Sequence, residues 1–194
     1  IGGTKTSFGF VDRQGALILA TSIPTKADNS VDKFLSRLHQ EVEKARSGLS
    51  PHNLLGIGIG APNSNYYRGT IENPVNLNWG EIIYFVDLMK KYYSLPVFIT
   101  NDAKTAALGE MLFGNARGMK HFLVITIGTG LGSGSVAHGH LIYGYSGFAG
   151  EIGHTVVDPQ GRSCKCGKKG CLETYVSGPG QGNRGPGPAG AVER

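Results

Sequence analysis

The segment from Gly150 to Glu173 constrains the fold of this chain more than any other stretch, because it holds every cysteine of the protein. The candidate ligands follow a His-x9-Cys-x-Cys-x4-Cys order and are His154, Cys164, Cys166 and Cys171. One imidazole and three thiolates form the ligand set of a closed tetrahedral zinc site, which leaves no position for water. We therefore predict a structural Zn²⁺ that builds this loop.

Two other interpretations of the cysteines are weaker. Three unrelated buried thiols and a surface histidine are possible, but the loop is rich in glycine and lysine and has no apolar core pattern. A disulfide is disfavoured because the number of cysteines is odd, and because Cys164 and Cys166 are too close in sequence to pair easily.

The length and composition are those of an ordinary globular protein. With 194 residues, 40% of them hydrophobic and 17% charged, the chain can bury the core of one large domain or two small ones. It has neither a run of about eighteen apolar residues nor a signal-peptide pattern, so we expect no membrane span and a cytoplasmic location, which suits reduced thiols. The net charge of +5 fits a solvated face or an anionic ligand such as ATP as well as it fits nucleic acid.

Strand-like and helical patterns alternate along the chain, which is typical of an α/β protein with hairpins and crossovers. Strands are expected at Lys5–Val11, Ala16–Ile23, Leu54–Gly60, Pro96–Thr100, Phe122–Ile127, Gly134–His138 and Leu141–Tyr143. Helices are expected at 31–46, Glu81–Tyr93 and Ala103–Phe113. Ser30 is placed to cap the first helix and Gly48 to end it.

The chain divides into three parts. We expect a first domain over residues 1–116, a partial second domain over residues 117–177, and a tail over residues 178–194. The tail is rich in glycine and proline and cannot bury enough apolar surface to fold, so we expect it to be disordered. The start at Ile1 within a strand-to-turn segment and the abrupt change after Ser177 lead us to expect a fragment boundary or a frameshift.

Two glycine–threonine turns, at residues 1–4 and 127–132, each lie beside a predicted strand. Glycine lets the backbone approach a ligand closely and lets successive N–H groups point at an anion. Two such turns facing each other across a cleft would grip the phosphates of a nucleotide from both sides. Neither turn fits the Walker or the Rossmann pattern, and a pair of tight hairpins that merely need glycine is the alternative.

The run Thr100-Asn101-Asp102 ends a predicted strand and begins a predicted helix. Asn101 or Asp102 could simply cap that helix. Alternatively, a carboxylate at the end of a strand faces a cleft and accepts a proton from a substrate hydroxyl, which is sufficient chemistry for phosphoryl transfer. The pattern leaves both interpretations open.

Four segments in order resemble the ROK family of bacterial sugar kinases and repressors over residues 1 to about 177. They are IGGTKTSFGFVD, then GIGIGAPN with IENPVNLNW, then TNDAKTAALGE, and last ITIGTGLGSG followed by GEIGH and CKCGKKGCLE. The resemblance implies an actin-like, ribonuclease-H-like ATPase fold, in which two α/β domains close on a nucleotide and sugar cleft and the second is incomplete here. It also implies ATP-dependent phosphorylation of a hexose, and the GAPN and ENPVNLNW segments favour glucose.

The resemblance further implies roles for single residues. Asp102 would be the general base that takes the proton of the sugar 6-hydroxyl, and Asn101 would bind the neighbouring hydroxyls. Glu151, His154 and Glu173 would hold the far side of the sugar, unless the two glutamates are plain surface charges. His154 would also be a zinc ligand, together with the three cysteines. The phosphate loops would comprise Gly2, Gly3, Thr4 and Lys5 in the first, and Gly128, Thr129, Gly130 and Gly132 in the second.

Other implied features are less complete. Pro62, Asn63 and the run Asn73–Trp79 would line the sugar side, although Asn76 and Trp79 could be loop packing. Family members usually carry an aspartate that orients Mg²⁺ two residues before the Gly-Gly-Thr turn, which is ahead of Ile1 in this chain. The adenosine-binding segment would follow residue 177. We therefore expect the chain as given to be inactive or nearly so.

Three classes of function follow. The first is an ATP-dependent hexose kinase, and the second is a sugar-sensing repressor, which in this family adds a helix-turn-helix. The third is a zinc-stabilised binding module without catalysis. Nucleic acid is an expected partner only if a helix-turn-helix precedes residue 1, and the family resemblance implies a homodimer. The hexose itself stays open among glucose, N-acetylglucosamine, N-acetylmannosamine, mannose, fructose and allose.

Overall fold

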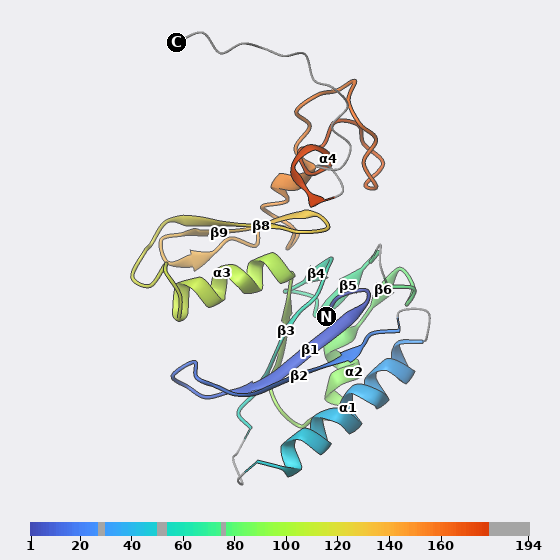
Figure 1. The fold of residues 1–194 in the computed structure, drawn as a ribbon, viewed down its shortest axis with the longest axis vertical. Coiled ribbons are helices and arrows are strands. Elements are labelled where there is room, and N and C mark those ends of the chain that lie inside the picture. Colours follow the sequence, from blue (N-terminus) through green and yellow to red (C-terminus); the bar gives the residue numbers. More distant parts are fainter. Residues whose placement is uncertain (27–29, 50–53, 75–76, 179–194) are drawn as a thin grey trace.

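The computed structural model of the protein describes residues 1–26, 30–49, 54–74 and 77–178 and has an α/β architecture (Figure 1). Apart from Gly178, the tail predicted to be disordered lies outside these residues. The strands are β1 Lys5–Val11, β2 Leu17–Pro24, β3 Ile57–Gly60, β4 Ser64–Asn65, β5 Thr70–Glu72, β6 Ile82–Ile83, β7 Val97–Thr100, β8 Phe122–Ile127, β9 Leu131–Ala137 and β10 His140–Leu141. The helices are α1 Val31–Ser47, α2 Phe85–Lys90, α3 Asp102–Leu112, α4 Glu173–Val176 and the 3₁₀ turn η1 Ile152–His154. None of these helices combines the length and apolarity that membrane crossing requires.

The strands form four small sheets. β1 and β2 are an antiparallel hairpin, while β3 and β7 pair in parallel with Ile57 opposite Val97. β4, β5 and β6 form an antiparallel sheet, and β8, β9 and β10 form another. Helix α3 begins directly after β7. The first residues of α3 therefore lie at the carboxyl end of the parallel β3–β7 pair.

The main core packs the helices α1 and α2 against the strands of the first half of the chain. Phe34 and Phe85 are fully buried there, and α1 turns Phe34, Leu35 and Leu38 inward as their helical spacing predicts. The Ser30 hydroxyl accepts from the Lys33 N–H and Gly48 is the C-cap, so both predicted ends of this helix are confirmed.

Helix α3 lies along the β8–β9 hairpin (Figure 1), and small residues bring the two close together. Ala103 and Ala107 are buried on the face of α3 that meets β9. A Cβ added to Gly134 of β9 would lie 2.5 Å from the Cβ of Ala107, and one added to Gly132 would lie 2.8 Å from that of Ala103. The close packing therefore requires glycine on the strand, and it fixes the start of α3 beside the β8–β9 turn.

The helix predicted at Glu81–Tyr93 is wrong in its first turn and too long. Ile82 and Ile83 form β6, and α2 spans only Phe85–Lys90. Ile83 pairs with Ile71 of β5 and is buried, so a strand pairing with a distant segment overrides the local helical spacing. β4 and β5 lie between residues 61 and 80, where the sequence analysis expected neither a strand nor a helix, whereas the other predicted elements overlap the observed ones.

Candidate active site

A cavity of about 1140 Å³ lies between the start of α3, the β8–β9 turn and the cysteine-containing loop. The predicted site residues that line it are Asn101, Asp102, Gly128, Thr129, Gly130, Gly132, Glu151, His154, Cys164, Cys166 and Glu173. Pro62, Asn63 and Asn73 of the predicted sugar-side segments line it too. The fold therefore brings segments that are far apart in the sequence to one polar cavity.

Asn101 and Asp102 stand where β7 ends and α3 begins. The Asn101 side-chain oxygen accepts from the Ala103 N–H at 2.9 Å and from the Lys104 N–H at 3.4 Å, so Asn101 does cap α3. One carboxylate oxygen of Asp102 accepts from the Ala103 N–H at 2.8 Å. The Asp102 side chain is exposed to the cavity, and within the described residues its second oxygen has no protein partner. Asp102 thus presents an acceptor to the cavity while the helix holds its other oxygen.

The four predicted zinc ligands meet at one point. Their ligand atoms all lie within 4.8 Å of one another. The sulfurs of Cys166 and Cys171 are 3.6 Å apart, as are the Cys164 sulfur and the His154 Nδ1. A tetrahedral zinc with bonds of about 2.3 Å to sulfur separates its ligand atoms by roughly 3.8 Å, so donor set and spacing both fit this ion.

The loop that carries the cysteines is held by its own backbone. Cys164 donates its N–H to the Lys168 carbonyl at 2.8 Å, and the Gly167 N–H returns to the Cys164 carbonyl at 3.1 Å. Gly167 has a φ of +88°, which only glycine adopts without strain. Burial raises the pKa of the Cys164 thiol, whereas a hydrogen bond from the Lys168 backbone lowers the pKa of Cys166.

Glu173 joins the cysteine loop to the β8–β9 turn. One of its carboxylate oxygens accepts from the Leu131 N–H at 3.1 Å. The other lies 3.8 Å from the His154 Nδ1 and 3.5 Å from the Cys164 sulfur. A Cβ on Gly130 would stand 2.7 Å from the first oxygen, so the turn needs glycine at this point because of the carboxylate.

Glu151, the residue directly before η1, lines the same cavity. Desolvation raises the pKa of its carboxyl group, while the Lys104 ammonium and His154 act in the opposite direction. Lys104 lies on α3, is 1% exposed, and donates to the Gly147 carbonyl at 3.1 Å. A buried cation thus sits behind the carboxylate that faces the cavity.

The first glycine turn is elsewhere. Gly2, Gly3, Thr4 and Lys5 are not among the described residues that line this cavity. The Gly2 N–H donates to the Lys5 carbonyl at 3.0 Å, and the Thr25 hydroxyl donates to the Gly2 carbonyl at 2.6 Å. This is a tight turn leading into β1, and its role as a phosphate loop stays a prediction.

A family model described as the ROK family matches residues 1–184. The chain belongs to the ROK family. The match runs past Ser177, where the sequence analysis placed the end of the resemblance. ROK kinases of known structure have an actin-like ATPase fold, and the α/β architecture of this ROK chain agrees with it.

Relatives of two kinds are found. This ROK chain is 40% identical over 184 residues to a glucokinase of Halalkalibacterium halodurans, with 93% of this chain and 56% of the relative covered. It is 41% identical over 128 residues to the xylose repressor of Bacillus subtilis, with 66% of this chain and 33% of the repressor covered. The chain therefore spans about half the length of the curated glucokinase it matches.

Among solved structures, the ROK glucokinase of Streptomyces griseus in complex with glucose and AMPPNP superposes with a TM-score of 0.80 at 35% identity. The superposition covers 93% of this ROK chain and 56% of the Streptomyces chain. A ROK family transcriptional regulator also superposes with a TM-score of 0.79 at 30% identity, so kinases and regulators of the family both match this chain in sequence and structure.

Sequence reasoning missed Lys104 and misjudged one aromatic residue. The signal for Lys104 was a lysine on a helix face otherwise made of alanines, which implies that its ammonium meets a polar group inside. The Trp79 ring packs at a tilt against Phe34, with 4.8 Å between centroids, and stacks on Phe85 at 6.1 Å, so it packs against the core as the alternative interpretation held. Asn76 lies outside the described residues.

Proposed function

We propose that this chain is part of an ATP-dependent hexose kinase that converts glucose to glucose 6-phosphate. The observation that carries the proposal is the cavity in which Asp102 and Asn101 face Glu151, His154 and Glu173 beside a glycine turn. The glucokinase relatives, and the glucose and ATP-analogue complex of the Streptomyces griseus structure, support the sugar and the nucleotide.

Asp102 is the general base in this proposal. Its free carboxylate oxygen takes the proton of the sugar 6-hydroxyl, and the hydroxyl oxygen attacks the γ-phosphorus of ATP, with ADP as the leaving group. The N-terminal end of α3 carries a partial positive charge that stabilises the ionised carboxylate between turnovers. Phosphoryl transfer needs mainly positioning and charge stabilisation, so one well-placed base is sufficient chemistry.

The sugar is oriented by the surrounding polar groups. Asn101 uses its oxygen to cap α3, which leaves its amide N–H groups to donate to a sugar hydroxyl. Glu151 and Glu173 accept from hydroxyls on the other side of the ring, through charge-assisted hydrogen bonds. Because the His154 Nδ1 faces the thiols, its Nε2 is available for a further hydroxyl.

The phosphates of ATP are assigned to the two glycine turns. The β8–β9 turn presents the backbone of Gly128, Thr129 and Gly130 to the cavity, together with Gly132 of β9. Gly2, Gly3, Thr4 and Lys5 would complete the grip from the first turn. Mg²⁺ would accompany ATP and neutralise charge on its phosphates, and a structural Zn²⁺ would hold His154 and the three cysteines.

The wider proposals rest on the family resemblance. We propose two α/β domains, 1–116 and 117–177, with the second completed by sequence beyond this chain. The whole protein would be a cytoplasmic homodimer that serves glycolysis. Because the chain spans 56% of its glucokinase relative, we expect the 194 residues alone to show little or no turnover.

The test is an Asp102→Asn substitution in the complete gene product, assayed for glucose-dependent ADP release. General base catalysis contributes about 10²- to 10⁴-fold, so we expect kcat to fall by that factor while glucose affinity is retained. Asp87→Asn is the matched control, because that carboxylate lies on α2 with 71% of its side chain exposed. Undiminished turnover in Asp102→Asn would refute the assignment of the base.

The second candidate is a sugar-sensing repressor, favoured by the identity to the xylose repressor of Bacillus subtilis. A repressor would bind its sugar in the same cavity without consuming ATP. A panel of hexoses and ATP analysed for ADP, together with sugar binding by calorimetry, separates the two. Binding without turnover for every sugar of the panel would favour the repressor.

A further inference from the structure

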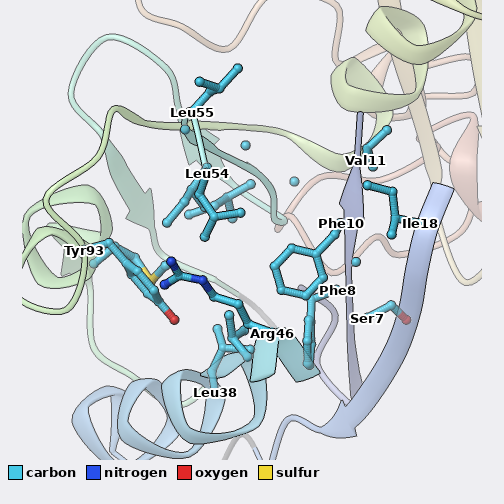
Figure 2. A pocket seen from close by; sticks show the side chains of 18 of the residues that line it. Ser7, Phe8, Phe10, Val11, Ile18, Leu38, Arg46, Leu54, Leu55 and Tyr93 are labelled. Carbon is cyan, nitrogen blue, oxygen red and sulfur yellow. The ribbon is translucent and has the colours of Figure 1, made fainter. Parts of the chain in front are cut away.

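Lys104 is the only charged residue that is buried among the described residues, with 1% of its surface exposed. Other charged side chains keep contact with solvent. Arg46, for example, lines an apolar cavity of about 820 Å³ between β1 and β3 (Figure 2), yet 47% of its side chain is exposed. Burying an ammonium group is costly unless it is paired, and an apolar side chain of similar volume often serves stability as well or better. Stability alone therefore does not explain a lysine at this position.

The Lys104 ammonium holds one turn of the backbone. It donates to the carbonyl of Gly147 at 3.1 Å and lies 6.0 Å from the centre of the Tyr143 ring. Gly147 belongs to residues 143–150, which follow β10 and end directly before Glu151, and we call this segment the Gly147 turn. The one buried charge of the described chain thus makes its hydrogen bond to the segment that leads to a proposed sugar ligand.

Asn65 of β4 holds the same turn from another side. This residue is 1% exposed, and its amide nitrogen donates to the Ser146 carbonyl at 3.0 Å, across 81 residues of sequence. Its amide oxygen accepts from the Tyr67 N–H at 3.1 Å and the Arg68 N–H at 3.3 Å, which fixes the orientation of the amide. Neighbouring carbonyls of the Gly147 turn, those of residues 146 and 147, therefore accept from buried side chains of two different elements.

The rest of the turn transmits this hold to Glu151. The Ala149 N–H donates to the Tyr143 carbonyl at 2.9 Å and closes the turn. The Ser133 hydroxyl donates to the Gly150 carbonyl, and Glu151 is the next residue. The backbone between the held carbonyls and Glu151 is therefore hydrogen-bonded at both of its last two residues, which leaves little freedom for Glu151 to move independently.

The placement of Lys104 also links Glu151 to the proposed base. Lys104 follows Asp102 by two residues on α3, so the helix that presents Asp102 to the cavity also holds the turn that presents Glu151. Burial lowers the pKa of the Lys104 ammonium, and the Glu151 carboxylate opposes this effect. The attraction between the two charges acts in the same direction as the hydrogen bond to Gly147.

We propose that Lys104 and Asn65 are positioning residues of the sugar site, which hold the Gly147 turn between α3 and β4 and so fix Glu151 opposite Asp102. Neither residue is among those that line the cavity, so each acts through Glu151 and not by contact with the sugar. The inference rests on the proposed function, in which Glu151 accepts from a sugar hydroxyl.

The test is Lys104→Met in the complete gene product, with glucose binding measured by calorimetry. Methionine has a similar length but neither the charge nor the donors of lysine. We expect glucose affinity to fall at least about fivefold in the Glu151 protein, and by less than about twofold when Glu151→Ala is already present, because residues that act through one group are not additive. Lys90→Met, on α2 with 55% of the lysine side chain exposed, is the matched control and should leave affinity unchanged.

Steady-state kinetics separate positioning from a merely structural role. We expect Lys104→Met to raise KM for glucose by the same factor as the loss of affinity and to leave KM for ATP within about twofold. A merely structural lysine would instead lower the melting temperature and the fraction of molecules that bind glucose, with an unchanged Kd for the folded fraction. That result would overturn the inference.

Asn65→Asp tests the same turn from β4. The aspartate keeps an oxygen for the N–H groups of Tyr67 and Arg68 but cannot donate to the Ser146 carbonyl. It should weaken glucose binding only while Glu151 is present, and it decides the question if Lys104→Met does not fold. Equal losses with and without Glu151 would contradict the inference and leave the kinase proposal standing. If Glu151→Ala by itself left glucose affinity unchanged, both the inference and the proposed role of Glu151 would be wrong.

Discussion

At the residue scale, Glu173 connects three parts of the candidate site. One oxygen of its carboxylate holds the Leu131 N–H of the β8–β9 turn, and the other lies beside His154 and Cys164. A single carboxylate thus touches the proposed phosphate turn, the proposed metal ligands and the cavity. The negative charge of the Glu173 carboxylate strengthens the hydrogen bonds that it accepts.

Replacing this charge should weaken sugar binding. Glu173→Gln keeps an oxygen for Leu131 but removes the charge-assisted bond to a sugar hydroxyl, which is worth about 1.5–3 kcal/mol. We expect glucose affinity of the complete protein to fall roughly tenfold or more by calorimetry. Glu81→Gln, at an exposed position beside β6, is the control and should leave affinity unchanged. An unaffected Glu173→Gln protein would mean that Glu173 is only a structural or surface charge.

Glu151 makes stability depend on pH. Its pKa in the folded protein is raised above its ordinary value of 4.5 by desolvation. The folded state therefore holds the proton more tightly than the unfolded state, and this contribution to stability is complete below pH 4.5 and is lost as pH rises through the folded pKa. We expect Glu151→Gln to flatten this decline in urea unfolding measured as a function of pH. An equally steep decline in the Glu151→Gln protein would assign it to another group.

At the scale of elements, the contact between α3 and β9 positions Asp102. The contact depends on the absence of side chains at Gly132 and Gly134, which lets α3 approach the strand. Moving α3 away from β9 would carry Asp102 away from the β8–β9 turn, so the packing of the two elements fixes the shape of the cavity.

Two glycine-to-alanine substitutions should therefore change the free energy of unfolding in opposite directions. Gly134→Ala places a Cβ 2.5 Å from Ala107 and should lower the free energy of unfolding by about 1–3 kcal/mol through overpacking. Gly109→Ala, on α3 with nothing within 4 Å of the added Cβ, should raise it by about 0.5–1 kcal/mol, because alanine is the better helix former. Urea titrations of both variants measure the difference, and destabilisation by both would contradict the packing argument.

Local signals predicted the elements well, and distant pairings caused the errors. Ser30, Gly48 and the spacing of Cys164, Cys166 and Cys171 act within a few residues, so their consequences can be read from the sequence. The helix predicted from the spacing that begins at Ile82 was wrong, because Ile83 pairs with β5, which lies more than ten residues away in the sequence. The burial of Lys104 depends on Gly147, which no local pattern connects to it.

At the scale of the whole molecule, the cysteine loop and the cavity share His154. The loop lies at the far end of the molecule from α1 and α2 (Figure 1), and several of its residues, His154, Cys164 and Cys166 among them, line the cavity. Local folding of a metal loop and metal binding are coupled, so a zinc ion held by the proposed ligands would also fix this wall of the cavity.

Removing the metal should affect binding as well as folding. We expect chelation of the complete protein to release zinc, lower the melting temperature and weaken glucose binding roughly tenfold or more, since His154 and Glu173 lose their fixed positions. Metal analysis, thermal unfolding and calorimetry on one sample measure the three effects, and re-addition of Zn²⁺ is the control. Glucose affinity that survives complete metal loss would refute the double role of His154.

Trp79 has a spectroscopic consequence. It is the only tryptophan of the chain, and it lies between Phe34 and Phe85 in the core near α1 and α2. Its emission reports the loosening of that core, while the cavity and the cysteine loop contain no indole. During denaturation, thiol titration would report the opening of the cysteine loop and tryptophan emission would report the opening of the core. The two ends of the molecule can therefore be followed separately without an added label.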